Sequence, residues 1–355
     1  MLGRPTLGLY QSRPPATGTT ALARGIPYPE RAMMIRIGSR GSQLALWQAN
    51  HIAEKLRSSG HTVEIQVIRT TGDRMQQPGF AAPADFDGQS LDSKGIFIKE
   101  IEDALAEGLI DVAVHSLKDL PTTLDARFTL AAIPERADAR DVWVCEPYWG
   151  LHTLPLYGRV GTTSPRRQAQ LLALRPDLEF VEVRGNIDTR LRKLEEGACD
   201  ALVLAAAGLD RLGRTEHVHY RFSPEELCPA PGQGALALET RSPEHPLDTE
   251  DPDRDPDILR ALNALDDKHA RYATTAERAT LEGLGGGCML PIGVFCSVER
   301  DLVTIHSQVL SPDGESMIVG ELEGGPATAP EVLGQRLATM LIQRGALELL
   351  PDPLL

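Results

Sequence analysis

The sequence predicts an α/β fold of two or three domains, with mostly parallel strands and a compact C-terminal domain. Strand-like and helix-like patterns alternate from about residue 33 to residue 204, which is typical of α/β layers. The chain has 355 residues, a length suited to two or three domains. From residue 293 onward the pattern is richer in strands and closes with one helix, so a smaller α+β unit is expected there.

Each expected element follows from its hydrophobic period and its turn residues. Ser42 is a suitable N-cap for the first helix and Gly60 a suitable end. Strands are expected at 35–38, 63–68, 110–115, 159–161, 180–183, 201–204, 293–298, 302–310 and 317–322, and helices at 42–56, 96–106, 165–174, 188–194, 258–265, 275–284 and 330–344. The apolar run 201–209 is interpreted as a buried strand entering a turn, and the acidic stretch 248–257 as an exposed loop or linker.

Composition excludes several classes of protein. Hydrophobic residues make up 42% and charged residues 24% of the chain, as in ordinary globular proteins. The net charge of −14 argues against general nucleic-acid binding, and no apolar run approaches the roughly 20 residues that span a membrane. Five cysteines without a CxxC pair predict neither a disulfide framework nor a zinc site, and they favour a reducing compartment.

Residues 1–32 differ from the rest of the chain. They hold five prolines and four arginines but one acidic residue, Glu30. This composition is typical of a transit-like or disordered leader, and it also fits an upstream reading of the start, because Met33 and Met34 directly precede the first strand. A continuous apolar region is missing, which favours the absence of a signal peptide.

Arginines gather in one part of this acidic chain. Residues 159–192 hold seven arginines against four acids, whereas residues 241–267 hold nine acids against three arginines. Arginine binds carboxylates and phosphates through a planar fork, so the first stretch suggests a local anionic ligand. The competing interpretation is a solvated, salt-bridged helix face.

Two similar openings, at 38–40 and 161–164, place hydroxyls and backbone N–H groups where a helix begins. Such helix ends suit carboxylates and phosphates, and Arg40 and the pair Arg166 and Arg167 lie beside them. Two facing ends would form an interdomain cleft for an acidic ligand. Ordinary helix capping with surface arginines would give the same pattern.

Two further segments carry reactive groups. Residues 115–121 follow a buried strand, and within them Asp119 is suited to proton transfer or to steadying a cation, and Lys118 to holding an anion. Cys288 stands in the glycine-rich stretch 284–293, where a sulfur can carry a bound group. The simpler interpretations are a structural turn and an incidental cysteine. The turn 231–234 is either a hinge or a ligand-facing loop.

Eight segments, in this order, closely resemble the hydroxymethylbilane synthase family, also called porphobilinogen deaminases. They are 39–48, 94–95, 115–121, 161–168, 184–190, 207–212, 231–234 and 286–288, and the resemblance runs from about residue 33 to the C-terminus. It implies two domains similar to periplasmic binding proteins and transferrins, with a smaller C-terminal α+β domain. The implied bounds are 33–134 with 235–252 for the first domain, 139–228 for the second and 257–355 for the third, after an extension at 1–32.

The resemblance also implies a reaction and its residues. A dipyrromethane cofactor is carried on Cys288 through a thioether, four porphobilinogens are added head to tail with loss of ammonia, and water releases hydroxymethylbilane. Asp119 is implied as the catalytic carboxylate. Implied cofactor ligands are Lys94, Ser116, Lys118, Thr162, Thr163, Ser164, Arg166, Arg167, Arg184 and Arg190, and implied substrate ligands are Arg40, Ser42, Gln48, Arg184, Arg190, Arg211 and Gln233. A cytoplasmic monomer without metal, nucleic acid or membrane partner is expected.

The chain departs from the family pattern at several positions. Gly285 replaces the usual glutamate before Gly-Gly-Cys, Met289 replaces a polar residue, and Ser90 replaces a lysine. The changes at Gly285 and Met289 put in doubt how the loop with the cysteine is held, and the change at Ser90 puts in doubt one contact with a ligand carboxylate. The acidic loop at about 242–255 is longer than is common.

Two other classes of function remain as alternatives. A non-catalytic two-domain clamp for a small anion has a compatible fold but needs neither Asp119 nor a modified Cys288. An acyl-transfer enzyme with a cysteine nucleophile needs a histidine base, for which His269 and His306 are the nearest in sequence. The ordered set of motifs favours the synthase over both.

Overall fold

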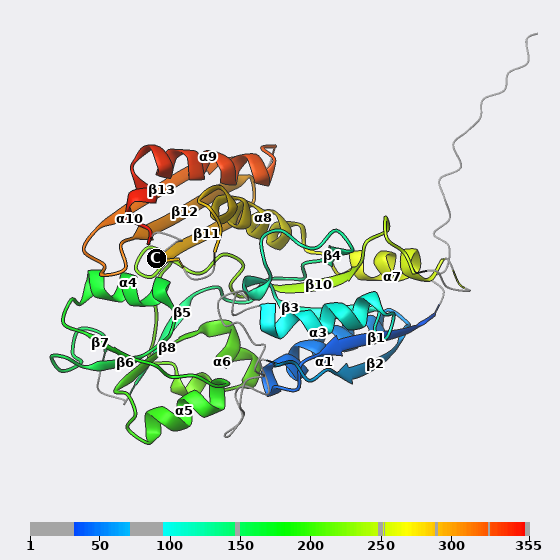
Figure 1. Ribbon diagram of the computed structural model, residues 1–355, viewed down its shortest axis with the longest axis horizontal. Coiled ribbons are helices and arrows are strands. Elements are labelled where there is room, and N and C mark those ends of the chain that lie inside the picture. Colours follow the sequence, from blue (N-terminus) through cyan, green and yellow to red (C-terminus); the bar gives the residue numbers. More distant parts are fainter. Residues whose placement is uncertain are drawn as a thin grey trace, which may run out of the picture. The chain divides into compact units, whose positions relative to one another are not determined.

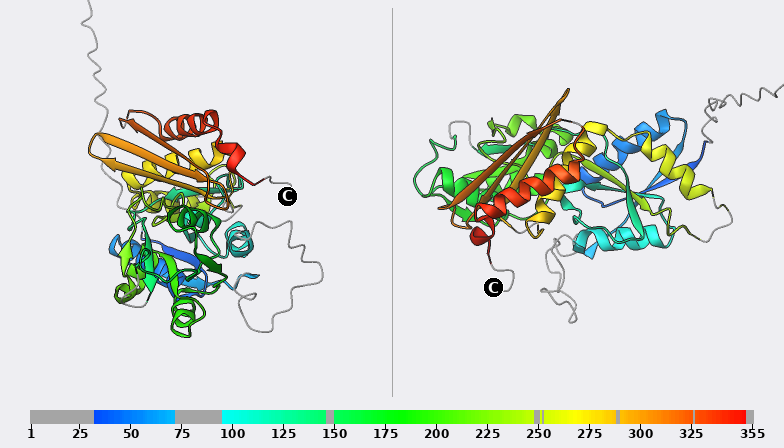
Figure 2. Two further views of the ribbon diagram at one scale, coloured as in Figure 1. Left: turned by 90° about the vertical axis from the view of Figure 1, so that its left-hand side faces the viewer. Right: turned by 90° about the horizontal axis from the view of Figure 1, so that it is seen from above.

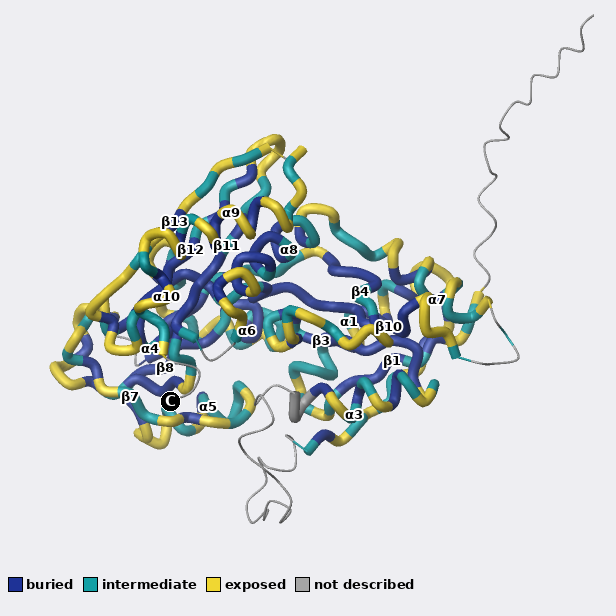
Figure 3. Tube along the Cα trace, turned by 45° about the horizontal axis from the view of Figure 1, so that its top comes forward, coloured by how far each residue is buried: buried dark blue, intermediate teal, exposed yellow. Residues whose placement is uncertain are grey.

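The computed structural model describes residues 32–71, 95–145, 150–247, 251, 253–287, 290–325 and 327–351. Buried residues concentrate in the central strands and in the helix faces that pack on them, and loops are mostly exposed or half-buried (Figure 3). In the described ranges, no helix combines the length and apolarity that a membrane crossing requires. Lys94, Cys288 and residues 1–31 lie outside the described residues.

The first domain is a five-stranded sheet with the order β2-β1-β3-β10-β4 (Figure 1). Its elements are β1 (Met34–Ser39), α1 (Gln43–Ser58), β2 (Thr62–Val67), α3 (Gly95–Ala106), β3 (Val112–Ser116), β4 (Phe128–Ala132), β10 (Leu236–Arg241) and α7 (Arg254–Asn263). Ile52 of α1 packs with Val112 and Val114 on one face, and Ile101 of α3 packs with Ala113 on the other. Alternate side chains of β3 thus meet helices on opposite faces.

The second domain is another five-stranded sheet, with the order β7-β6-β8-β5-β9. Its elements are β5 (Asp141–Cys145), β6 (Arg159–Gly161), α4 (Pro165–Leu174), β7 (Glu179–Val181), α5 (Ile187–Glu195), β8 (Ala201–Ala205), α6 (Ala206–Leu212) and β9 (Tyr220–Arg221). Leu171 of α4 packs with Trp143 on one face. Leu191 of α5 and Leu209 of α6 pack with Val142 on the other.

The two sheets share one topology. In each sheet the fourth strand in order, β10 or β5, runs antiparallel to both of its neighbours. The chain passes from β4 to β5 in a first crossover and returns from β9 to β10 in a second crossover. β5 and β10 are therefore the strands at which the chain enters each sheet from the other domain. The openings β1–α1 and β6–α4 occupy equivalent places, which explains their similar sequences.

The third domain is an antiparallel sheet of β11 (Ile292–Glu299), β12 (Leu302–Leu310) and β13 (Met317–Gly324) with helices α8 (Lys268–Gly283), α9 (Pro330–Gln343) and α10 (Ala346–Leu349). Both views of Figure 2 show α9 running along these strands. α8 and α9 approach closely at Gly334, because a Cβ there would lie 2.2 Å from the carbonyl oxygen of Ala276. A side chain at this position would force the helices apart.

A buried carboxylate connects the third domain to both crossovers. Glu277 of α8 is fully buried and accepts hydrogen bonds from the Arg136 guanidinium at 2.7 and 3.1 Å. It also accepts from the backbone N–H of Gly232 at 2.7 Å and of Cys296 at 2.8 Å. Arg136 lies in the first crossover and Gly232 in the second, so one side chain holds both against α8.

The expected fold class is confirmed, while the predicted domain bounds stay a prediction. Among the described residues, six helices and strands were not predicted: β4, β5, β9, β10, α6 and α10. Strand β10 carries the buried polar residues Glu239, Thr240 and Arg241, so its sequence lacks the apolar pattern of a buried strand. The run 201–209 continues into helix α6 rather than a turn, because an unbroken apolar run does not distinguish strand from helix. Within the expected loop 248–257, residues 254–257 begin α7.

Strand β10 also completes a buried acidic cluster under α3. Glu239 is fully buried and its Oε2 lies 2.9 Å from His115 Nε2. Burial and, to a lesser extent, the charge of Glu239 raise the pKa of Glu102 on α3 from 4.5 to about 7. His115 and Arg127 oppose this rise, whereas Asp125 adds to it.

Glu102→Gln is expected to stabilise the protein at high pH and leave it unchanged at low pH. The folded protein favours the protonated carboxyl of Glu102. Its contribution to the free energy of unfolding is therefore fully present below pH 4.5 and is lost as pH rises through about 7. After allowance for solvent screening, the gain at pH 8 is about 1–2 kcal/mol in the free energy of unfolding. Urea unfolding at pH 4.5 and pH 8 measures it, with exposed Asp103→Asn as control. An equal change at both pH values would contradict the prediction.

Candidate active site

The segment that follows β3 lies against the turn 231–234. Leu117–Asp119 forms a short 3-10 helix, η1, in which Leu117 is buried and Asp119 exposed. Gly232 has a φ of +74°, and a Cβ there would lie 3.0 Å from Leu117 Cγ and 3.2 Å from the Lys118 nitrogen. Because the backbone is left-handed and the contact is close, glycine is required here. The turn therefore supports η1 and is not exposed to solvent as a free loop.

Gln233 joins Lys118 to a buried carboxylate. Its side chain is fully buried, and its Oε1 accepts a hydrogen bond from Lys118 Nζ at 3.1 Å. Its Nε2 donates to the carbonyl oxygen of Ala139 at 2.7 Å and to Asp141 Oδ1 at 2.9 Å. Gln233 was predicted to bind substrate; the structure places it between two charged groups.

Asp141, the first residue of β5, holds two arginines from the start of α4. Arg167 Nε and Nη2 donate to its Oδ1 at 3.1 and 2.6 Å, and Arg166 Nη2 forms an ion pair with its Oδ2 at 2.8 Å. The arginines also donate to the carbonyl oxygens of Cys228 and Val203, at 2.5 and 2.9 Å. Burial alone would raise the pKa of Asp141, but both guanidinium groups hold it well below its usual range.

We call Lys118, Asp141, Arg166 and Arg167 the cationic cluster. It contains three cations and one carboxylate, so it carries excess positive charge. Burial and, to a lesser extent, the charge of Arg167 lower the pKa of Lys118 to about 8. Asp141 was not a predicted site residue, because it lies in a strand whose pattern was missed. The sequence feature that could have identified Asp141 is its position as an acidic residue at the start of an otherwise apolar run.

Arg190 and Asp119 lie within electrostatic reach of the cationic cluster. Arg190 Nε donates to the carbonyl oxygen of Gly185 at 2.8 Å. Burial and, to a lesser extent, the charge of Arg167 lower the pKa of Arg190 to about 10, although Asp119 opposes the shift. Asp119 likewise opposes the lowered pKa of Lys118. The predicted catalytic carboxylate is thus exposed beside several cations.

The hydroxyls at the two helix openings mostly cap their own turns. Ser42 Oγ accepts from the N–H of Ala45 at 3.3 Å. Ser164 Oγ accepts from the N–H of Arg167 at 3.4 Å, and Thr162 Oγ1 accepts from the N–H of Ser164 at 3.2 Å. Thr163 is exposed. Capping therefore accounts for part of the pattern that also suggested anion binding.

Two predicted ligands from different elements meet at the end of β3. Gln48 of α1 is buried, and its Nε2 donates to Ser116 Oγ at 3.0 Å. Arg40 is half-buried before α1. These residues border the same strand end as η1.

Two predicted arginines have other neighbours. Arg184 is exposed and pairs with Glu182. Arg211 of α6 donates to the carbonyl oxygen of Gly234 at 2.7 Å, and its guanidinium lies 5.8 Å from the ring centre of Trp47 on α1. Arg211 therefore links the second domain to the first.

The segment that leads to Cys288 starts beside the turn that follows Asp119. A Cβ on Gly286 would lie 3.7 Å from Thr122 Oγ1. Thr123 Oγ1 donates to Glu282 Oε1 at 3.4 Å. The last described residues before Cys288 are therefore near η1.

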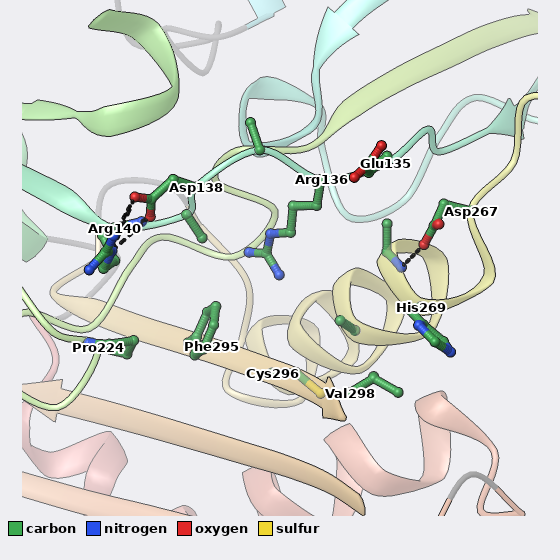
Figure 4. Close-up of a pocket in the computed structure, with 14 residues that line it drawn as sticks. Glu135, Arg136, Asp138, Arg140, Pro224, Asp267, His269, Phe295, Cys296 and Val298 are labelled. Carbon is green, nitrogen blue, oxygen red and sulfur yellow. Dashed lines mark hydrogen bonds and ion pairs between the residues drawn. The ribbon is translucent and has the colours of Figure 1, made fainter. Parts of the chain in front are cut away.

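A separate cavity of about 480 Å³ lies between the first crossover, the start of α8 and β11 (Figure 4). Arg136, Asp138 and Arg140 line it from the crossover, with His269 and Cys296 opposite. The residues that line this cavity include no predicted site residue and no member of the cationic cluster. Across the described ranges, no group of three His, Cys, Asp or Glu side chains is arranged to hold a metal ion.

Comparison with known proteins decides the family. The pattern described as "Porphobilinogen deaminase, dipyromethane cofactor binding domain" matches residues 35–249, and "Porphobilinogen deaminase, C-terminal domain" matches residues 272–343. The chain belongs to the porphobilinogen deaminase family. It is therefore a member of a transferase family of tetrapyrrole biosynthesis that uses a dipyrromethane cofactor.

Relatives of this family cover nearly the whole chain. Porphobilinogen deaminase of Roseiflexus castenholzii is 44% identical over 89% of this chain and 98% of its own length. Porphobilinogen deaminase of Acidothermus cellulolyticus is 45% identical over 90% of this chain and 92% of its own length. Among solved structures, a putative methionine-binding lipoprotein from Bacillus subtilis covers 67% of this chain and 92% of its own, with a TM-score of 0.37 and 14% identity.

Proposed function

We propose that this chain is an active hydroxymethylbilane synthase, in which the cationic cluster and Asp119 form the reaction site. It adds four porphobilinogens head to tail, each with loss of ammonia, and water releases the linear tetrapyrrole. The observation that carries the proposal is the excess of buried positive charge beside an exposed aspartate. Such a site suits a ligand that is rich in carboxylates and becomes cationic as it reacts.

The residues present fit the dipyrromethane cofactor of the family. Each of its pyrrole rings bears an acetate and a propionate, and the cationic cluster supplies charge of the opposite sign. We propose that Ser116, Lys118, Thr162, Thr163, Ser164, Arg166, Arg167, Arg184 and Arg190, with Lys94, hold these carboxylates. When bound, the cofactor supplies the pyrrole end to which the first substrate is joined.

Asp119 is proposed as the catalytic residue. Its exposed carboxylate stabilises the positive charge that develops on the substrate as ammonia departs. Stabilisation of developing charge by a fixed group is often worth several kcal/mol. Arg40, Ser42, Gln48, Arg184, Arg190, Arg211 and Gln233 are proposed to bind substrate or to place the groups that do.

Cys288 is proposed as the attachment point for the cofactor. The other four cysteines, all within the described residues, are buried. Burial raises the pKa of Cys199, Cys228 and Cys296 above the ordinary thiol value. The thiolate is the nucleophilic form, so these three are poorly suited to attachment. By resemblance to the family, we further propose a cytoplasmic monomer with the predicted domain bounds.

Intact-protein mass spectrometry with peptide mapping tests the proposed function. The purified chain is expected to carry an added mass equal to two condensed porphobilinogen units on the peptide that contains Cys288. Cys288→Ser is expected to lack this mass because a serine hydroxyl is scarcely ionised at neutral pH and is a weak nucleophile. Cys296→Ser is the matched control and keeps it, since this buried thiol lies on β11.

Incubation with porphobilinogen separates the synthase from a binding clamp. The synthase consumes porphobilinogen and releases a tetrapyrrole. An unmodified chain that binds porphobilinogen but gains no covalent mass and releases no product would support the anion-binding alternative. A Cys288→Ser variant with covalent dipyrromethane would refute the attachment site.

A further inference from the structure

Arg278 on α8 contacts the segment that directly follows Asp119. Its guanidinium donates to three consecutive carbonyl oxygens: Leu120 at 3.3 Å, Pro121 at 2.6 Å and Thr122 at 2.9 Å. Pro121 has no N–H and so cannot donate a hydrogen bond to a neighbouring carbonyl. The planar, permanently charged fork of an arginine can satisfy several such carbonyls at once.

The same helix leads to the cysteine segment. α8 ends at Gly283, and the described chain continues to Gly287, immediately before Cys288. One turn after Arg278, Glu282 accepts a hydrogen bond from Thr123 Oγ1. The helix therefore holds the segment after Asp119 at two points and continues toward the proposed attachment point.

We propose that Arg278 is a positioning residue that fixes Asp119 relative to α8 and the described residues 284–287 that follow it. This inference rests on the proposed function. The reacting groups must meet in a narrow geometry, and a displacement of about 1 Å can cost on the order of 100-fold in rate. Arg278 acts through the backbone of residues 120–122, which directly follow Asp119.

Arg271 offers a matched control on the same helix. Its Nη2 donates to the carbonyl oxygens of Leu130 and Ala131 at 3.3 and 3.0 Å, and its Nε pairs with Asp266. Like Arg278, it ties α8 to backbone carbonyls of the first domain. Unlike Arg278, it contacts the end of β4 rather than the segment after Asp119.

Steady-state kinetics of the cofactor-loaded enzyme give the first test. Arg278→Gln is expected to lower kcat about 10- to 100-fold while KM changes less than about threefold, because the proposed substrate-binding arginines remain. Arg278→Lys, which keeps the charge but not the fork, is expected to recover part of kcat. Arg271→Gln is expected to keep the wild-type kcat even if it lowers Tm as much as Arg278→Gln does.

Hydrogen–deuterium exchange of the loaded enzyme gives a second readout that does not depend on turnover. Arg278→Gln is expected to speed exchange in residues 117–124, and Arg271→Gln in residues 130–133 instead. If Arg278→Gln does not fold, Arg278→Lys carries both measurements.

The outcomes separate this inference from the proposed function. A wild-type enzyme that fails to load or turn over porphobilinogen refutes the proposed function. An active wild type with unchanged kcat and unchanged exchange at 117–124 in the Arg278 variants refutes the positioning role. Equal losses of kcat in the Arg271 and Arg278 variants, in proportion to Tm, would also refute it, because a merely structural tether would then explain both.

Discussion

Replacing Asp119 with asparagine will leave a folded, cofactor-loaded protein whose kcat is about 10²- to 10³-fold lower. The amide keeps the shape of the carboxylate but loses the charge that stabilises a cation. Asp119 is exposed at the end of η1, so stability should change by about 0.5 kcal/mol or less. KM should stay constant or fall, since a negative charge is removed beside Lys118 and Arg190.

The measurement is single-turnover consumption of porphobilinogen, with intact mass to confirm cofactor loading. Asp125→Asn is the matched control: Asp125 is also an exposed aspartate of the first domain, but it lies before β4 and its carboxylate binds Arg127. The control should retain wild-type turnover. Near-normal turnover in Asp119→Asn would rule out the catalytic role of this carboxylate.

Asp141→Asn is expected to have the largest effect on stability, lowering the free energy of unfolding by about 3–5 kcal/mol. The two guanidinium groups that meet Asp141 are buried, and without its charge they have no anionic partner in the cationic cluster. Asparagine also puts an NH2 donor in place of one carboxylate oxygen, among guanidinium groups that are themselves donors, which adds to the cost. An insoluble variant would be the extreme form of the same result.

Urea unfolding measures this loss, and Asp200→Asn provides the control. Asp200 binds Arg159 through two oxygens in a similar fork, but both side chains are partly exposed. A solvent-exposed pair of this kind contributes about 0–1 kcal/mol. If Asp141→Asn cost no more than the control, the buried network would not support the fold as described.

Local sequence signals were enough to predict those helices and strands whose bounds depend on neighbouring residues. The bounds of α4, 165–174, were predicted correctly because Ser164 caps the helix and Pro165 occupies its first turn. The strand before it and the equivalent pair β1–α1 were found in the same way. Family motifs then placed the predicted site residues on these turns.

The partners of those residues could not be predicted, because they are distant in sequence. Arg166 and Arg167 were expected to face a ligand, but the carboxylate of Asp141 occupies several of their N–H groups. That contact exists because β5 enters the second sheet beside β8. No periodicity in either segment indicates such a crossing. Arg278 was missed for the same reason, since its acceptors are backbone carbonyls of another domain.

The double crossover between the sheets has a consequence for the order of folding during synthesis. All five strands of the second sheet, β5 to β9, are contiguous in the chain and can pair as soon as they emerge from the ribosome. The first sheet cannot close at that stage, because β3 and β4 are joined only through β10, which is made after the entire second domain. Contacts of long sequence separation form slowly. The domain translated first is therefore completed only after the second domain has been made. Until then its strands β3 and β4 present unpaired edges, which favour aggregation.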